Sequence, residues 1–88
     1  MLKANIAVLV SGGGTNLQAL IDSQKSGIIS SGEITLVISN NANAYALQRA
    51  SNAGIKTEVI IKKQLGSQEA FEQRLVEILT ENGIELIV

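Results

Sequence analysis

Residues 6–17, IAVLVSGGGTNL, join five apolar residues to a serine, three consecutive glycines and the start of a helical pattern. An unbroken apolar run of this length is typical of a strand covered on both faces, as in a parallel sheet. After the glycines, Leu17, Leu20 and Ile21 recur at the spacing of one helical face. Gly27 then stands where a helix end favours a left-handed residue. The stretch predicts a buried strand, a glycine turn and a helix.

The same alternation continues along the chain. Three more strand-like runs occupy residues 34–38, 57–61 and 84–88, with a helical pattern between each pair. The second helix is expected to end at Gly54, and its inner face is formed by Ala44, Leu47 and Ala50 or Ser51. Strands that alternate with helices of this length pair in parallel through right-handed crossovers. The prediction is an α/β fold with an open parallel, Rossmann-like sheet, built as β-α-β-α-β-α-β.

The third helix has the clearest start and stop signals. Ser67 is a favoured N-cap residue, and Glu69 places a negative charge in the first turn, where the helix dipole favours it. Gly83 is expected to end the helix. The apolar stripe comprises Phe71, Leu75, Ile78 and Leu79.

The spacing of these elements leaves no room for a linker, so residues 1–88 are expected to form a single subdomain. The last run, residues 84–88, looks like a buried strand, yet no helix follows to cover it. An open apolar strand is prone to pair with other chains. We therefore expect a fold truncated after its fourth strand, whose sheet is completed by self-association or by another segment of protein.

Composition argues against several classes of function. Seven basic and eight acidic residues give a net charge of -1, which offers no broad attraction to nucleic acid or to an anionic membrane. The 88 residues include no cysteine and no histidine, so thiolate metal sites, a cysteine nucleophile and a histidine base are all excluded within this sequence. No apolar run approaches the roughly 20 residues that span a bilayer, and the start lacks the features of a signal peptide. A cytoplasmic protein without a metal site is the simplest expectation.

The glycine turn is the strongest candidate site. Open parallel sheets bind ligands at the carboxyl ends of their strands, where this turn lies. The first N–H groups of a helix have no intrahelical partner, and the helix dipole places partial positive charge there. A phosphate on the amides of Gly14, Thr15 and Asn16, which Gly12 and Gly13 allow to approach closely, would satisfy both. The alternative is a tight turn that Thr15 caps and that binds no ligand.

Two common nucleotide motifs are not matched by the turn. The dinucleotide fingerprint requires a third glycine where this chain has Leu17, and an acidic residue where the second strand ends in Ser39-Asn40-Asn41. The Walker pattern is absent because no Gly-Lys-Ser/Thr follows the glycines. These differences disfavour NAD and ATP and favour a monophosphate.

Residues 6–19 closely resemble the opening of the phosphoribosylglycinamide formyltransferases of de novo purine synthesis. Residues 39–55, 67–75 and 83–88 match later blocks of that family less specifically, so the resemblance covers essentially the whole chain. It implies an enzyme that transfers a formyl group from 10-formyltetrahydrofolate to the amine of glycinamide ribonucleotide. It also implies that Gly14, Thr15 and Asn16 bind the phosphate of that substrate.

The resemblance also implies what this chain lacks. The family's catalytic Asn, His and Asp lie beyond the position that matches Val88, so the chain is expected to be inactive alone. At the position of Gln68 the family usually has an arginine that contributes to the formyl-folate site. Gln68 is therefore a candidate for binding the formyl donor, and the alternative is an exposed residue in the first turn of a helix.

Two other functional classes stay open. Another enzyme of the same core, such as formyltetrahydrofolate deformylase or methionyl-tRNA formyltransferase, is disfavoured because neither substrate presents a ribose monophosphate to the glycine turn in the same way. A non-catalytic phosphate-binding module that acts with a partner chain is the remaining alternative.

Further polar and aromatic residues admit a ligand-binding and a structural interpretation. Asn40 and Asn41 could line the pocket or serve turn chemistry. Tyr45 could stack on a ring or pack against the fold, and Lys62-Lys63 could meet an anion or be solvated.

Overall fold

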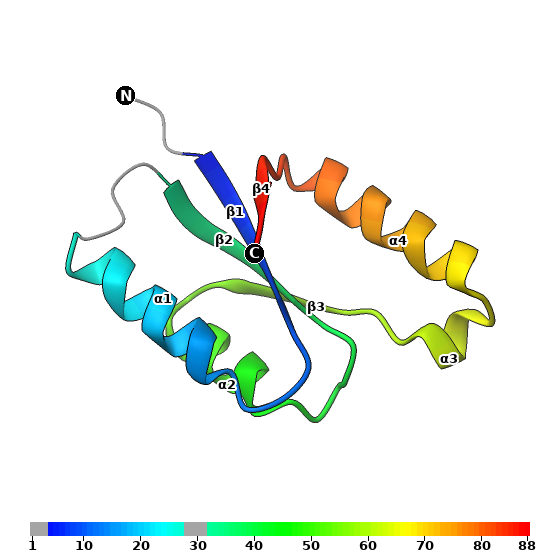
Figure 1. The fold of residues 1–88 in the computed structure, drawn as a ribbon, viewed down its shortest axis with the longest axis horizontal. Coiled ribbons are helices and arrows are strands. Elements are labelled where there is room, and N and C mark those ends of the chain that lie inside the picture. Colours follow the sequence, from blue (N-terminus) through cyan, green and yellow to red (C-terminus); the bar gives the residue numbers. More distant parts are fainter. Residues whose placement is uncertain (1–3, 28–31) are drawn as a thin grey trace.

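A computed structural model describes residues 4–27 and 32–88 of the chain. The described strands are Ala4–Val10 (β1), Gly32–Ser39 (β2), Lys56–Val59 (β3) and Leu86–Ile87 (β4). They form one parallel sheet in the order β3-β2-β1-β4. The described helices are Thr15–Lys25 (α1), Tyr45–Asn52 (α2), Lys62–Leu65 (α3) and Gln68–Glu81 (α4). The predicted open parallel α/β fold is confirmed (Figure 1).

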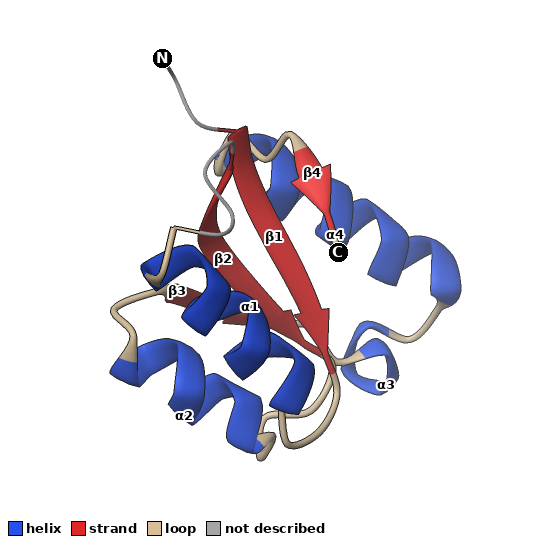
Figure 2. Ribbon diagram, turned by 60° about the vertical axis from the view of Figure 1, so that its left-hand side comes forward, coloured by secondary structure: helices blue, strands red, loops and turns tan. Residues whose placement is uncertain are grey.

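Helices cover both faces of the sheet (Figure 2). On one face, α1 and α2 pack over a buried cluster that comprises Ile6, Val8, Leu17, Ile21, Ile34, Val37, Ala46 and Ala50. On the other, α4 packs over Ala7, Leu36, Ile38, Ile60 and Ile78. Successive residues of β1 enter opposite clusters, which is why an unbroken apolar run was needed there.

A register shift in the pairing of β1 with β2 changes the face that β2 presents. Ile6 pairs with Ile34, whereas the next residue, Ala7, pairs with Leu36, so Thr35 is the extra residue. Ile34 therefore packs under α1 and α2, and Leu36 packs under α4.

The expected helix ends are confirmed. Gly27, Gly54 and Gly83 all adopt positive φ, and the Ser67 side chain caps α4 by accepting a hydrogen bond from the N–H of Ala70 at 3.1 Å. The inner face of α2 differs in part from the prediction. Ala44 and Ala50 are buried as predicted and Leu47 is partly buried, whereas Ser51, the alternative to Ala50, is exposed. Ala46 is also buried, although it was not predicted to be.

The region between β3 and α4 departs from the sequence prediction. The expected strand 57–61 ends at Val59, and a helical turn that was not predicted, α3, begins three residues later at Lys62. Gly66, with φ 87°, ends α3 before the Ser67 cap. Four residues are too few to show a helical period in the sequence, which explains the omission.

The fourth strand is exposed, as expected of a strand without a covering helix, although its apolar sequence is typical of a buried strand. Leu86, Ile87 and Val88 are each about half exposed, because β4 lies at the edge of the sheet and pairs only with β1 among the described strands. Backbone hydrogen bonds extend this pairing from Glu85 to Val88, and Val88 both donates to Ala7 and accepts from Leu9. None of the helices described in residues 4–27 and 32–88 is long and apolar enough to cross a membrane.

Candidate functional site

The glycine turn lies where the sheet changes its direction of growth. From β1 the chain adds β2 and then β3 on one side, and it returns to add β4 on the other side of β1. Connections on either side of such a switch point leave in opposite directions, and this opens a crevice at the carboxyl ends of the strands. The turn between β1 and α1 lies at the carboxyl end of β1 (Figure 2).

Gly14, not Thr15, is the N-cap residue of α1. Gly14 adopts φ 78° and ψ 30°, and no side chain caps the helix. The alternative prediction, a ligand-free turn that Thr15 caps, is therefore wrong about the cap. Thr15 is the first helical residue, and its hydroxyl does not cap the helix. Within residues 4–27 and 32–88, no side chain caps the start of α1.

Three successive carbonyl groups of the turn are engaged by the protein itself. The Gly12 oxygen accepts from the N–H of Ala46 at 3.1 Å, which satisfies one free donor at the start of α2. The Gly13 oxygen accepts from Nε of Arg49 at 2.7 Å. The Gly14 oxygen accepts from the N–H of Gln18 at 2.8 Å. All three carbonyls thus point toward α1 or α2.

The N–H groups of the same peptide units point the other way. A trans peptide holds its N–H opposite its carbonyl, and no cis peptide bond occurs in the described chain. The N–H groups of Gly13, Gly14 and Thr15 belong to these three units, and neither they nor the N–H of Asn16 donates to any residue that the structure describes. The turn is therefore not closed on itself.

A cleft of about 300 Å³ lies in front of these donors. Its lining includes Gly12, Gly14, Thr15 and Asn16 on the turn, and Val88 beyond β4. None of the lining residues carries an acidic side chain that would repel an anion; they are Val8, Leu9, Val10, Ser11, Gly12, Gly14, Thr15, Asn16, Leu17, Leu20 and Val88. The structure brings four of the five predicted turn residues together in the cleft. Gly13 is not among the lining residues, and its carbonyl faces Arg49 instead.

The fold itself requires a glycine at only one of the three turn positions. At Gly14 the positive φ and the closeness of Ala46 both exclude a side chain. A Cβ atom on Gly12 or Gly13 would meet nothing within 4 Å, and neither residue adopts positive φ. The open space at these two positions suits the close approach of a ligand.

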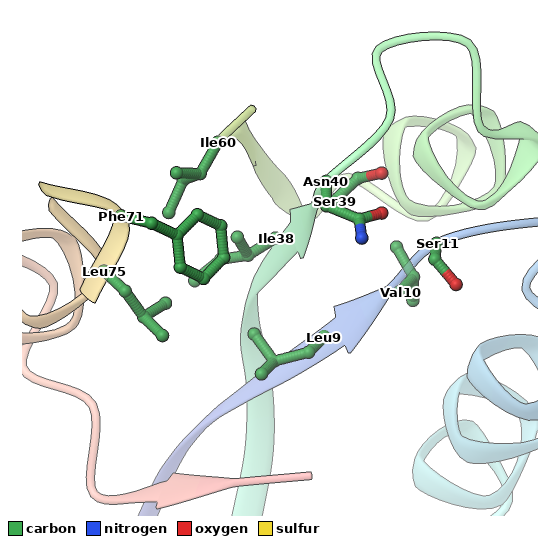
Figure 3. A pocket seen from close by; sticks show the side chains of 9 residues that line it. All are labelled: Leu9, Val10, Ser11, Ile38, Ser39, Asn40, Ile60, Phe71 and Leu75. Carbon is green, nitrogen blue, oxygen red and sulfur yellow. The ribbon is translucent and has the colours of Figure 1, made fainter. Parts of the chain in front are cut away.

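A second cavity, of about 240 Å³, lies on the α4 side of β1. Figure 3 shows Phe71 and Leu75 of α4 facing Leu9, Ile38 and Ile60 across it. The polar part of its lining comprises Ser11, Ser39 and Asn40. This cavity is mainly apolar, in contrast to the cleft at the glycine turn.

The two asparagines after β2 have different roles. Asn41 serves turn chemistry, because its Oδ1 accepts from the N–H of Asn43 at 3.0 Å and its backbone exchanges two hydrogen bonds with the hydroxyl of Ser39. Asn40 lines the second cavity. The turn interpretation therefore holds for Asn41, whereas neither asparagine lines the cleft at the glycine turn.

Gln68 is exposed at the start of α4 and lines neither cavity. Its Nε2 donates to Oε1 of Glu72 at 3.1 Å, one helical turn further on. This is the surface arrangement named as the alternative for Gln68, and a contact with a formyl donor stays a prediction. Lys62 and Lys63 are exposed on α3, as expected of solvated residues.

Tyr45 and Arg49 form a pair that the sequence did not reveal. Tyr45 is 56% exposed, so the expectation that it packs against the fold is wrong. The guanidinium carbon of Arg49 lies 5.0 Å from the centroid of the Tyr45 ring, over its face. Arg49 stands 36 positions beyond the glycine whose carbonyl it binds, so no local pattern pointed to it. Among the described residues, no group of three or more His, Cys, Asp and Glu side chains is placed to hold a metal ion.

Comparison with known proteins shows which family and which proteins the chain resembles. The sequence model of a family described as formyl transferase matches residues 4–88. The chain is 48% identical over 85 residues to the trifunctional purine biosynthetic protein adenosine-3 of Gallus gallus. The aligned stretch covers 97% of this chain and 8% of that protein. It is 46% identical over 72 residues to the phosphoribosylglycinamide formyltransferase of Escherichia coli strain K12, covering 82% of this chain and 34% of that protein.

Solved structures agree with the sequence relatives. Glycinamide ribonucleotide transformylase 1 from Symbiobacterium toebii superposes with a TM-score of 0.90 at 40% identity, over 97% of this chain and 40% of that one. The phosphoribosylglycinamide formyltransferase of Coxiella burnetii gives a TM-score of 0.90 at 41% identity, over 98% of this chain and 40% of that one. The chain thus spans well under half the length of these relatives.

Proposed function

The chain belongs to the formyl transferase family, and on that premise we propose that it forms the part of a phosphoribosylglycinamide formyltransferase that holds the phosphate of glycinamide ribonucleotide. The observation that carries the proposal is the row of N–H groups from Gly13 to Asn16, which have no partner among the described residues and lie beside a cleft at the switch point of the sheet. The names of the relatives from Escherichia coli and Coxiella burnetii supply the substrate.

Each turn residue has its own part in the proposed site. The amides of Gly14, Thr15 and Asn16 donate to the phosphate oxygens at the positive end of α1. The Thr15 hydroxyl and the Asn16 side-chain amide, both on exposed residues, are further donors. Gly12 leaves the approach open, and Gly13 contributes through its fixed carbonyl and the open space around its Cα.

The expected affinity is modest. Three charge-assisted hydrogen bonds at about 1.5 kcal/mol each give about 4 to 5 kcal/mol. This corresponds to a dissociation constant on the order of 1 mM. The ribose and glycinamide parts of the substrate would have to add contacts of their own.

We assign the transfer of the formyl group, with 10-formyltetrahydrofolate as donor, to the enzyme as a whole. The sequence contains no histidine, so it offers no imidazole for proton transfer. The chain is therefore expected to bind phosphate without forming formylated product. Both reactants of the proposed reaction are small water-soluble molecules, which agrees with the cytoplasmic location predicted from the sequence.

A titration with inorganic phosphate followed by amide NMR tests the proposal. The signals of Gly14, Thr15 and Asn16 should move and saturate with a dissociation constant on the order of 1 mM, at constant ionic strength. The amides of Gly54 and Gly83, which lie at other helix ends and also adopt positive φ, serve as internal controls. Unmoved turn signals at tens of millimolar phosphate would contradict the proposal.

The exposed edge of β4 supports a second proposal, which concerns partners. The outer edge of β4 pairs with no described strand, and its side chains are apolar and half exposed. Such an edge pairs with a further strand when one is available. We propose that a second copy of the chain, or another segment of protein, completes the sheet there.

A further inference from the structure

We propose that Arg49 is a positioning residue for the phosphate site: it holds the Gly13 carbonyl so that the N–H of Gly14 faces the ligand. This inference rests on the proposed function and concerns a residue that does not line the cleft.

Arg49 is held by three interactions, one with the glycine turn, one with α1 and one within α2. Its Nε donates to the Gly13 oxygen at 2.7 Å, and its Nη1 donates to Oε1 of Gln18 at 3.3 Å. Its guanidinium lies over the ring of Tyr45, one turn earlier on α2. Because the guanidinium is planar, these contacts together fix the direction in which Nε points.

The peptide between Gly13 and Gly14 is the one most in need of such a restraint. A peptide flanked by two glycines rotates with little steric resistance, because neither neighbour has a Cβ atom. No atom of the described residues lies within 4 Å of the place where a Cβ on Gly13 would be, so packing does not hold the unit on the Gly13 side. Among the described residues, the hydrogen bond from Arg49 is the only polar contact of the Gly13 carbonyl.

Rotation of this peptide would be harmful to anion binding in two ways. It would turn the Gly14 N–H away from the cleft and bring the Gly13 carbonyl toward it. One donor would be lost, and a partial negative charge would face the phosphate. With Arg49 in place, the trans geometry of the peptide directs the Gly14 N–H away from α2.

The positive charge of Arg49 is a separate effect that the test has to isolate. Arg49→Lys keeps the charge but has a single point donor in place of the planar fork. Tyr45→Leu keeps the arginine and removes the aromatic face that supports it. Arg74→Gln is the matched control for net charge, because Arg74 lies on α4 and pairs on the surface with Glu77 at 3.3 Å.

The experiment measures phosphate affinity and the free-state amide signal of Gly14 in the 88-residue chain and in these variants, together with Arg49→Gln. Loss of one charge-assisted hydrogen bond, about 1.5 kcal/mol, predicts about tenfold weaker phosphate binding for Arg49→Gln. We expect Arg49→Lys and Tyr45→Leu to lie between this variant and the wild type. Arg74→Gln should match the wild type.

A displaced or exchange-broadened Gly14 signal in ligand-free Arg49→Gln is the signature of a released peptide, which a loss of overall stability would not produce. If the wild type does not respond to phosphate at all, the proposed function is overturned, and the role of Arg49 with it. If the wild type binds and Arg49→Gln binds equally well with an unchanged Gly14 signal, only the role of Arg49 is overturned. If Arg49→Gln fails to fold, the other two variants decide. Wild-type phosphate affinity in both Arg49→Lys and Tyr45→Leu would then overturn the role of Arg49.

Discussion

A Cβ atom on Gly14 would lie 2.6 Å from the Cβ atom of Ala46 and 2.8 Å from its Cα. The start of α1 and the start of α2 meet at this point, and they are joined there by the hydrogen bond from the Ala46 N–H to the Gly12 oxygen. The same glycine also adopts φ 78°. Two independent constraints, one steric and one conformational, therefore act on a residue that donates to the proposed ligand.

The first prediction follows for Gly14→Ala. A left-handed conformation costs a residue with a side chain about 1 to 2 kcal/mol, and overpacking against Ala46 adds about 1 to 3 kcal/mol. We expect the free energy of unfolding to fall by roughly 2 to 5 kcal/mol, as measured by urea denaturation.

Gly12→Ala is the control for that variant. Its new Cβ meets no atom within 4 Å and its φ is not positive, so the free energy of unfolding should stay within about 0.5 kcal/mol of the wild type. Equal losses in the two variants would show that the backbone around Gly14 is not constrained as described.

The second prediction concerns Ile78, which anchors α4 to the sheet. Ile78 is 1% exposed and packs in the cluster that also contains Leu36 and Ile38. Ile78→Ala should lower the free energy of unfolding by about 2 to 5 kcal/mol, because it leaves a cavity under the helix. Val76 lies on the same helix but is 60% exposed, so Val76→Ala should change this energy by no more than about 0.5 kcal/mol. Similar effects for both variants in chemical denaturation would contradict the packing of α4.

The third prediction concerns the Ser67 cap. Its hydroxyl oxygen is the acceptor for the N–H of Ala70, and the residue has the extended backbone of an N-cap, with φ -154° and ψ 161°. Ser67→Ala should cost about 1 kcal/mol, whereas Ser67→Asp retains an acceptor and should be nearly neutral. Thermal denaturation of the three proteins makes the comparison. An alanine variant as stable as the wild type would mean that the cap contributes nothing.

The fourth prediction concerns the edge strand. Ile87 is 48% exposed on β4, and a lysine on an edge strand opposes pairing with another chain. The average mass of the wild type in analytical ultracentrifugation should rise with concentration, and Ile87→Lys should remain monomeric. Val76→Lys adds the same charge at an exposed apolar position of α4 and should associate like the wild type. A wild type that stays monomeric at every concentration would remove the proposal that a second copy of the chain pairs through β4.

The order of the helices and strands was open to prediction because the signals involved are local. An apolar run such as Ile6 to Val10 shows a strand with two covered faces, and Gly27, Gly54 and Gly83 show where helices end. The Ser67 cap depends on residues within one helical turn. The glycine turn could be identified as a candidate site for the same reason, since its donors belong to the first turn of the helix that it begins.

Contacts between distant parts of the chain were decided only by the tertiary structure. The strand order β3-β2-β1-β4 places β4 at an exposed edge, although its sequence is as apolar as that of a buried strand. Folding also brings Ala46 and Arg49 of α2 against the glycine turn, more than 30 positions away, and so determines which glycine is constrained and which way its amides point. Propensity and periodicity describe residues that are neighbours along the chain. The exposure of β4 and the contacts of α2 with the glycine turn depend instead on how the crossover connections arrange the strands and helices in space.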